Sequence, residues 1–262
     1  MSAASPAGVH LEDLAWPQAK AWIERGAPVV IPIGAAAKEH GHHLPLSTDR
    51  RVAEALARRV AEALPVLVAP VVHFGYYPAF RHYPGSQHLA PATFTALLTD
   101  IVEGFVGQGV RRLAIINTGV STAPVIDVLA REIYERHAVR IAVADIARLG
   151  LTVRERFEQA LGGHGDEQET SLMLAIAPHL VDMARAPTDY GNLLGRAATV
   201  FREPAIFGAD PGSGIDYSAT GIRGDASLAS VEKGRVLLEA MVEDLVRGLR
   251  VTFFDDSGGD RR

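Results

Sequence analysis

The sequence contains no cysteine, and this absence excludes several kinds of chemistry. Without thiolates the protein forms no disulfides, zinc fingers or iron–sulfur clusters, and it has no cysteine nucleophile. Histidine and carboxylate side chains are therefore the only strong metal ligands that the chain offers.

The sequence also lacks an excess of positive charge and any long hydrophobic run. It has 26 Lys and Arg residues and 31 Asp and Glu residues, so its formal net charge is -5. This composition does not suggest the basic face with which proteins bind the phosphate backbone of nucleic acids. No apolar run approaches the roughly 20 residues of a membrane span, and Met1 to His10 do not show the pattern of a signal peptide. We therefore expect a cytoplasmic protein without a nucleic-acid or membrane partner.

Apolar residues, in contrast, are abundant: 48% of the 262 residues are hydrophobic, enough to fill a sizeable core. Short apolar runs alternate with longer stretches of helical period, as in strands joined by crossover helices. The expected strands are Pro28 to Ile33, Val66 to Val72, Arg112 to Asn117 and Arg140 to Asp145, all buried. The expected helices are Leu11 to Glu24, Arg50 to Ala63, Ala92 to Gly107, Ala123 to Arg136, Thr170 to Ile176 and Val231 to Arg250. This pattern predicts an α/β fold with a parallel sheet, in one domain from 1 to 254 with a flexible tail at 255–262.

The most informative segment runs from Pro32 to Asp49. A strand is predicted to end near Gly34 and a helix to start near Asp49, so the residues between them lie where open α/β sheets bind ligands. This segment holds three histidines and two carboxylates that suit a metal with nitrogen and oxygen ligands, namely Glu39, His40, His42, His43 and Asp49. Two plainer interpretations stay open: Thr48 or Asp49 caps the following helix, and the loop is merely solvated.

Three further segments carry polar or aromatic residues of interest. Between Gly162 and Leu174, two glycines flank His164, and Glu169 opens an apolar helix, where the helix dipole favours a carboxylate even without a ligand. The segment from Ile115 to Thr122 either supplies hydroxyls and backbone N–H groups to the same crevice or simply begins a capped helix. The aromatic segment from Gly75 to Ser86 suits a pocket lining or an interface.

Taken together, these segments resemble the creatininase (creatinine amidohydrolase) family, in the family's order from about Pro28 to Arg235. That family has a Glu-x-His-Gly-x-His-Leu-Pro-x-x-Thr-Asp loop, a Phe-Pro-Gly-Thr segment, an Asn-Gly-His-Gly-Gly-Asn loop, a His-Ala-Gly-x-x-Glu-Thr-Ser segment, and a late Gly-Asp-Pro followed by Glu-x-Gly-Arg. The matching segments here are His40 to Asp49, Tyr83 to Ser86, Asn117 to Thr122, His164 to Ser171, Gly224 to Ala226 and Glu232 to Arg235.

The resemblance implies a creatininase-like fold, a three-layer α/β/α domain with a mostly parallel central sheet. It also implies assembly into a homo-oligomer, often a hexamer. The cofactor that it implies is a divalent metal, namely zinc, manganese or iron. The activity that it implies is hydrolysis of a cyclic or linear amide C–N bond in a small molecule.

Two departures from the family bear on the metal. The family typically binds two metals: the Glu of Glu-x-His and the His of Asn-Gly-His hold one, the His of Glu-x-His holds the other, and the Asp bridges them. Here Lys38 stands at the position of that Glu, behind a one-residue insertion after Gly34, and Gly119 stands at the position of that His. Both losses fall on the same metal.

The resemblance therefore implies one metal per subunit, held by His40, Asp49 and Glu169. Either Glu39 replaces the lost ligand, or the Lys38 ammonium takes the vacated place and neutralises the carboxylates.

The resemblance also implies roles for the residues around the metal. His164 is expected to be the general acid or base, with Glu169 and Glu39 as catalytic carboxylates. Substrate contacts are expected from Ser121, Thr122, Tyr76, Tyr77, His43 and Asp166.

Three functions follow from these expectations. The first is a metal-dependent amidohydrolase for a substrate other than creatinine. The second is a mononuclear Fe(II) enzyme on the same scaffold. The third is a non-catalytic binding or structural subunit, for which Lys38 and Gly119 are the evidence.

Overall fold

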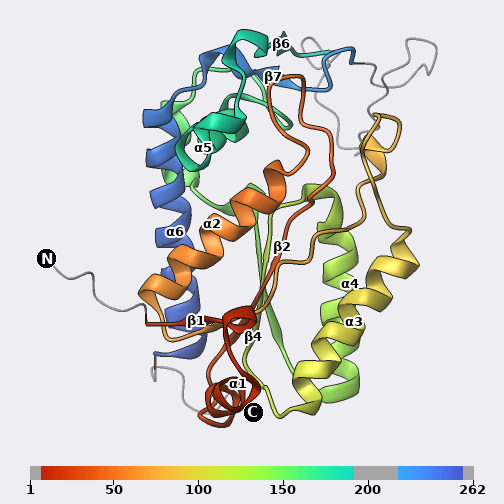
Figure 1. Ribbon diagram of the computed structural model, residues 1–262, viewed down its shortest axis with the longest axis vertical. Coiled ribbons are helices and arrows are strands. Elements are labelled where there is room, and N and C mark those ends of the chain that lie inside the picture. Colours follow the sequence, from red (N-terminus) through yellow and green to blue (C-terminus); the bar gives the residue numbers. More distant parts are fainter. Residues whose placement is uncertain (1–6, 192–217, 256–262) are drawn as a thin grey trace, which may run out of the picture.

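The structure is a computed structural model that describes residues 7–191 and 218–255. Its centre is a five-stranded, fully parallel sheet with the strand order β1-β3-β2-β4-β5 (Figure 1). The strands are β1 Val9–His10, β2 Val29–Ile33, β3 Leu67–Val68, β4 Leu113–Asn117 and β5 Ile141–Asp145. A separate antiparallel pair joins β6 Thr188–Asp189 to β7 Gly224–Asp225.

The α-helices are α1 Trp16–Glu24, α2 Thr48–Ala63, α3 Pro91–Gly107, α4 Ala123–His137, α5 Glu167–Ile176 and α6 Val231–Phe253. Short 3-10 helices connect them at Leu11–Asp13, Pro78–Phe80, Val120–Thr122, Ile146–Arg148, Leu151–Arg156, Pro178–Leu180, Met183–Arg185 and Ala226–Leu228. None of the helices in the described residues is long and apolar enough to cross a membrane.

Helices cover both faces of the sheet, and each face has its own core. Val30 and Ile116 pack with α2, α5 and α6 on one face, whereas Ile31 and Ile115 pack with α3 and α4 on the other (Figure 1). Neighbouring strand residues alternate between the two faces, so a strand covered on both faces is apolar throughout. The predicted three-layer α/β/α fold is confirmed.

The structure corrects details of the prediction. Only Leu67–Val68 of the expected Val66 to Val72 strand pairs continuously, because Pro70 has no N–H for the ladder; Val72 returns as a single bridge to Ile33. The strand expected at Arg140 to Asp145 lies at the sheet edge and is half-buried rather than buried. Apart from Asp255, the predicted tail lies outside the described residues.

Candidate active site

The loop after β2 brings several polar side chains into the interior at the carboxyl edge of the sheet. Gly34 makes this possible, because a Cβ there would lie 2.5 Å from the Asp49 carbonyl oxygen, so the start of α2 packs directly against the strand end. Asp49 lies in the first turn of α2, but no side chain caps that helix. The interpretation of Thr48 or Asp49 as a helix cap is therefore wrong, and the Asp49 carboxylate points to other partners.

Those partners are Lys38 and His40, which form a buried triad with Asp49. Lys38 Nζ lies 2.7 Å from Asp49 Oδ2, and His40 Nε2 lies 2.9 Å from Asp49 Oδ1. His40 Nδ1 lies 2.8 Å from the Lys38 carbonyl oxygen, so both ring nitrogens face acceptors. All three side chains are less than a tenth exposed. Of the two alternatives for Lys38 and Glu39, this geometry places the ammonium, and not Glu39, beside Asp49.

Burial and charge act in opposite directions on the pKa values of this triad. Burial and the Lys38 charge disfavour the imidazolium form of His40, but the charge and hydrogen bond of Asp49, together with the Glu169 charge, outweigh them and raise the pKa of His40. Burial likewise disfavours the Asp49 carboxylate, but Lys38 and His40 together hold the pKa of Asp49 below its ordinary range. The triad is thus a compensated cluster of charges rather than an isolated buried carboxylate.

A second pair joins the loop before α5 to the loop after β2. His164 Nε2 lies 3.0 Å from Glu39 Oε2, although the two residues are 125 positions apart. The other Glu39 oxygen accepts a hydrogen bond from the Gly41 backbone N–H. Gly221 packs against this carboxylate so closely that a Cβ would come within 1.9 Å of it. Glu39 is therefore fixed in orientation, and it fixes the His164 ring in turn.

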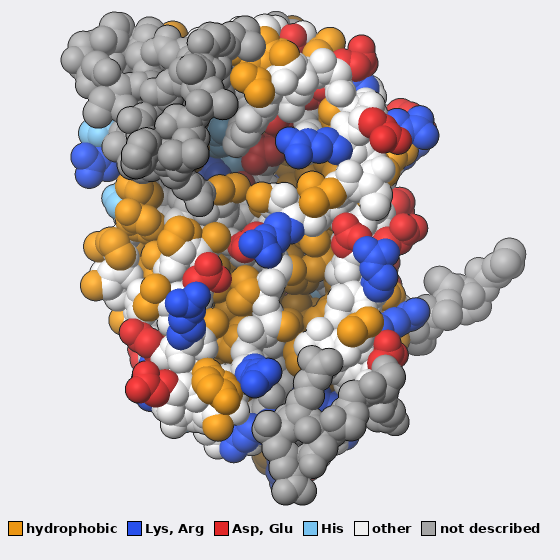
Figure 2. Space-filling view, turned by 180° about the vertical axis from the view of Figure 1, so that it is seen from behind, with side chains coloured by type: hydrophobic (Ala, Val, Ile, Leu, Met, Phe, Trp, Pro, Cys, Tyr) orange, Lys and Arg blue, Asp and Glu red, His pale blue; other side chains and the backbone are white. Residues whose placement is uncertain are grey.

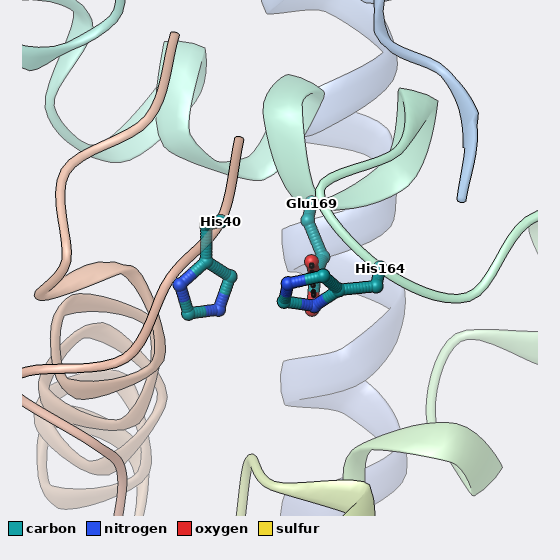
Figure 3. A group of neighbouring side chains, drawn as sticks. All are labelled: His40, His164 and Glu169. Atoms are coloured by element: carbon teal, nitrogen blue, oxygen red, sulfur yellow. Dashed lines mark ion pairs between the residues drawn. The ribbon is translucent and has the colours of Figure 1, made fainter. Parts of the chain in front are cut away.

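Glu169 completes the group from the first turn of α5. Its Oε2 accepts a 2.6 Å hydrogen bond from the Gly165 N–H and lies 3.8 Å from His164 Nδ1. One ligand atom each from His40, His164 and Glu169 lies within 4.8 Å of the others (Figure 3). Two ligands on one tetrahedral zinc ion, with bonds near 2.1 Å, lie about 3.4 Å apart. The group is thus close to the spacing that a single cation requires.

The predicted substrate-contacting residues divide into two sets. Tyr77, Ser121 and Thr122 line a small pocket together with Lys38 and Asp49. The Tyr77 hydroxyl nevertheless bonds to the Gln87 carbonyl oxygen, and Thr122 Oγ1 donates to Asn117 Oδ1 at 2.6 Å. Thr122 is thus committed to the loop after β4, and burial raises the pKa of Tyr77 to about 12.

The other predicted residues have structural partners. Asp166 is the N-cap of α5 and accepts the backbone N–H groups of Gln168 and Glu169. His43 Nε2 lies 2.7 Å from Thr170 Oγ1, and burial lowers the pKa of His43 to about 4. Tyr76 packs beside the core between the sheet, α3 and α4. Their roles toward a substrate stay predictions.

Two more side chains adjoin the site, and one of them, Ser86, was not among the residues predicted from the sequence. The Phe80 ring lies 4.1 Å from the His164 ring between centroids, and Ser86 Oγ accepts the Glu39 backbone N–H at 3.0 Å. Ser86 ends the segment that matched the family's Phe-Pro-Gly-Thr motif, and this match was the available signal. Phe80 precedes that motif and lies in the aromatic segment that the sequence predicted as a pocket lining or an interface.

Comparison with known proteins identifies the family of this chain. The sequence pattern of the creatininase family, described as creatinine amidohydrolase, matches residues 12–249. The chain belongs to the creatininase family. The resemblance inferred from its motifs is thereby confirmed.

Characterised relatives in the family differ in activity. Creatinine amidohydrolase of Pseudomonas putida is 29% identical and covers 94% of this chain and 97% of its own length. A 3-dehydro-scyllo-inosose hydrolase of Thermotoga maritima is 25% identical, with 95% and 86% covered. A mycofactocin precursor peptide peptidase of Mycobacterium tuberculosis is 29% identical, with 84% and 83% covered. The protein is thus a divergent member of a family of hydrolases, and membership alone does not fix the bond.

Solved creatininase structures share the fold. The manganese form has a TM-score of 0.77 at 27% identity, and a mutant described as Zn-Zn type has 0.78 at 26%. The first covers 95% of this chain and all of its own; the second covers 95% and 99%.

The described residues fit a divalent cation by the chemistry of their donors. The imidazoles of His40 and His164 and the Glu169 carboxylate, buried or half-buried, are donor types suited to zinc or manganese, and Asp49 beside His40 offers a further carboxylate. A cation at His40 would take the place of one of the hydrogen bonds that its ring now makes.

Proposed function

We propose that this protein is a metal-dependent amidohydrolase that cleaves a cyclic or linear amide C–N bond of a small molecule other than creatinine. The observation that carries this proposal is the group of His40, His164 and Glu169 at the carboxyl edge of the sheet. Family membership supports hydrolysis, and the departures at Lys38 and Gly119 argue for a changed substrate.

The proposed cofactor is one divalent cation per subunit, zinc, manganese or iron. His40, Asp49 and Glu169 are the proposed ligands, with Glu39 as a further carboxylate beside them. Asp49 Oδ1 lies 2.9 Å from His40 Nε2, whereas Lys38 pairs with the other oxygen, Oδ2, and this division supports the set. When bound, the cation would polarise the substrate carbonyl and lower the pKa of a bound water.

His164 is the proposed acid and base. Hydrolysis adds water across the amide: the hydroxyl joins the carbonyl carbon, the C–N bond breaks, and the proton passes to the leaving nitrogen. The Glu39 carboxylate holds His164 Nε2 and so orients the ring for this transfer. The Phe80 ring packs against the His164 ring, with 4.1 Å between the ring centroids.

Three further proposals concern the setting of the site. Ser121, Thr122, Tyr76, Tyr77, His43 and Asp166 are proposed to shape the substrate side. By family resemblance the protein is proposed to form a homo-oligomer, a hexamer, and to act in the cytoplasm.

The decisive experiment is the metal content per subunit, measured by inductively coupled plasma mass spectrometry on protein without an affinity tag. Glu169→Gln serves as the blank, because the amide keeps the shape but loses the charge. About one equivalent of metal that is lost in the blank, together with hydrolysis of amides in a substrate panel, is the expected result. Metal equal to the blank after incubation with zinc and manganese would refute the proposal.

A non-catalytic family member is the second candidate, and one observation favours it. The Lys38 ammonium already neutralises Asp49, so the fold does not need a cation at that carboxylate. Under this alternative the protein binds no metal and hydrolyses nothing, and the same experiment separates the two candidates.

A further inference from the structure

A pocket of about 500 Å³ lies next to the proposed metal site. Its walls are the 3-10 helices Ile146–Arg148 and Leu151–Arg156, the segment 157–163, the first turns of α5 and the middle of α6. Glu169 belongs both to this pocket and to the group with His40 and His164. The pocket therefore adjoins this group through Glu169, the one member of the group that lines it.

The wall combines polar and apolar surface in about equal parts, and several large side chains supply its apolar part. Leu149, Phe157, Leu161 and Leu172 line it, with Leu237 and Met241 contributed by α6. Burying an apolar group of a ligand against such side chains is favourable by the hydrophobic effect alone. The walls thus suit a substrate that carries a branched or aromatic apolar group.

Two charged groups of the wall, Asp166 and Arg154, differ in whether they already have partners in the protein. Asp166 is occupied, because its oxygens accept hydrogen bonds from Gly163, Gln159 and the first turn of α5. Arg154, in contrast, forms no ion pair with any described residue, and among those residues it is the only Lys or Arg lining this pocket. A guanidinium in this position is a ready partner for a carboxylate, which it binds through two parallel hydrogen bonds.

A space-filling view shows a hollow on one face of the molecule. In the upper part of the face in Figure 2, acidic and histidine side chains lie at the bottom of a hollow, and a basic side chain lies at its rim.

We propose that this pocket binds a carboxylate-bearing apolar moiety, so that the substrate is an N-acylated apolar amino acid or an amide of equivalent chemistry. This inference rests on the proposed function. The amide lies toward Glu169 and His164, the apolar side chain lies against the leucine-rich wall, and the carboxylate pairs with Arg154.

Binding of three probes to the protein as purified, measured by isothermal titration calorimetry, tests this assignment. N-acetyl-L-leucine carries both features, N-acetyl-L-leucinamide lacks the carboxylate, and N-acetylglycine lacks the apolar side chain. The first is expected to bind at least about tenfold more tightly than either of the others, because each analogue loses one of the two recognition elements.

Matched variants localise the effect. Arg154→Gln is expected to weaken N-acetyl-L-leucine binding about tenfold or more without changing N-acetyl-L-leucinamide binding. Arg156→Gln is the control, because Arg156 is exposed in the same 3-10 helix but does not line the pocket.

Two results would overturn the inference: no binding of N-acetyl-L-leucine at millimolar concentration, or equal binding by wild type and Arg154→Gln. Metal content and leucine release are assayed on the same samples. Retained metal and amide hydrolysis without carboxylate-dependent binding would refute only the pocket assignment. Loss of metal and of all hydrolysis would refute the proposed function instead.

Discussion

Lys38 is the residue whose partner matters most for the chemistry. Its ammonium is buried and lies 2.7 Å from Asp49, so replacing it by an apolar side chain leaves a buried carboxylate with weaker compensation. We expect Lys38→Met to lower the free energy of unfolding by about 3 kcal/mol, measured by urea denaturation in the presence of a chelator.

Lys20→Met is the matched control for Lys38. Lys20 is 61% exposed and pairs only with Glu24 one helical turn away, so its loss should cost about 0.5 kcal/mol or less. Equal unfolding midpoints for the two variants would contradict the charge-compensation argument for Lys38.

One substitution at His164 distinguishes its role as an acid and base from a role as a metal ligand. If it carries the proton, His164→Ala keeps the metal and loses turnover by roughly 10²- to 10⁴-fold. That is the outcome we expect, measured as metal content and amide hydrolysis on the same preparation. Loss of the metal with turnover would instead make His164 a ligand beside His40 and Glu169.

The sequence indicated which polar residues matter but not how they pair. Glu39, His40 and Asp49 stand out because three histidines and two carboxylates follow a strand end. Whether Lys38 or Glu39 approaches Asp49 depends on how the loop bends, and a local pattern does not encode that bend. The contact of Glu39 with His164 joins residues 125 positions apart, so no local spacing predicts it.

Among the helices, the packing of α6 against α5 rests on a glycine. A Cβ at Gly234 would lie 1.8 Å from the Ser171 carbonyl oxygen, so Gly234→Ala forces the helices apart. We expect a loss of about 2–3 kcal/mol in the free energy of unfolding. At Gly248 in the same helix, an added Cβ would have no atom within 4 Å. Gly248→Ala should therefore leave the free energy of unfolding unchanged or raise it slightly.

Thermal and urea denaturation of both glycine variants measures this difference. Equal destabilisation would show that helix propensity, and not the close approach to Ser171, governs the two positions.

The longer elements follow from hydrophobic period, whereas the shorter ones do not. Residues 29–33 and 113–117 are apolar throughout, because helices cover both faces of the sheet. β1 and β3 pair over only two residues each, which is too short for a periodic signal. The half-burial of β5 was missed because position in a sheet, and not composition, decides which strand is the edge.

For the molecule as a whole, the proposed cation ties together two distant parts of the chain. The proposed ligands His40 and Asp49 come from the β2 side and the proposed ligand Glu169 comes from α5, so only the folded chain would present all three. A ligand that binds the folded state alone, at about 100 times its dissociation constant, stabilises it by about 2.7 kcal/mol. For a chain of this size that free energy corresponds to about 5–10 °C in the melting temperature.

We therefore expect a chelator to lower the melting temperature of the wild type by several degrees, and added zinc or manganese to restore it. Glu169→Gln should melt near the chelated wild type and should not respond to either treatment, since its site is already broken. Differential scanning calorimetry measures both proteins side by side. If neither the chelator nor the metal changed the wild-type melting temperature, no cation would link the two loops. That result would favour the arrangement in which Lys38 and His40 compensate Asp49 without a cation.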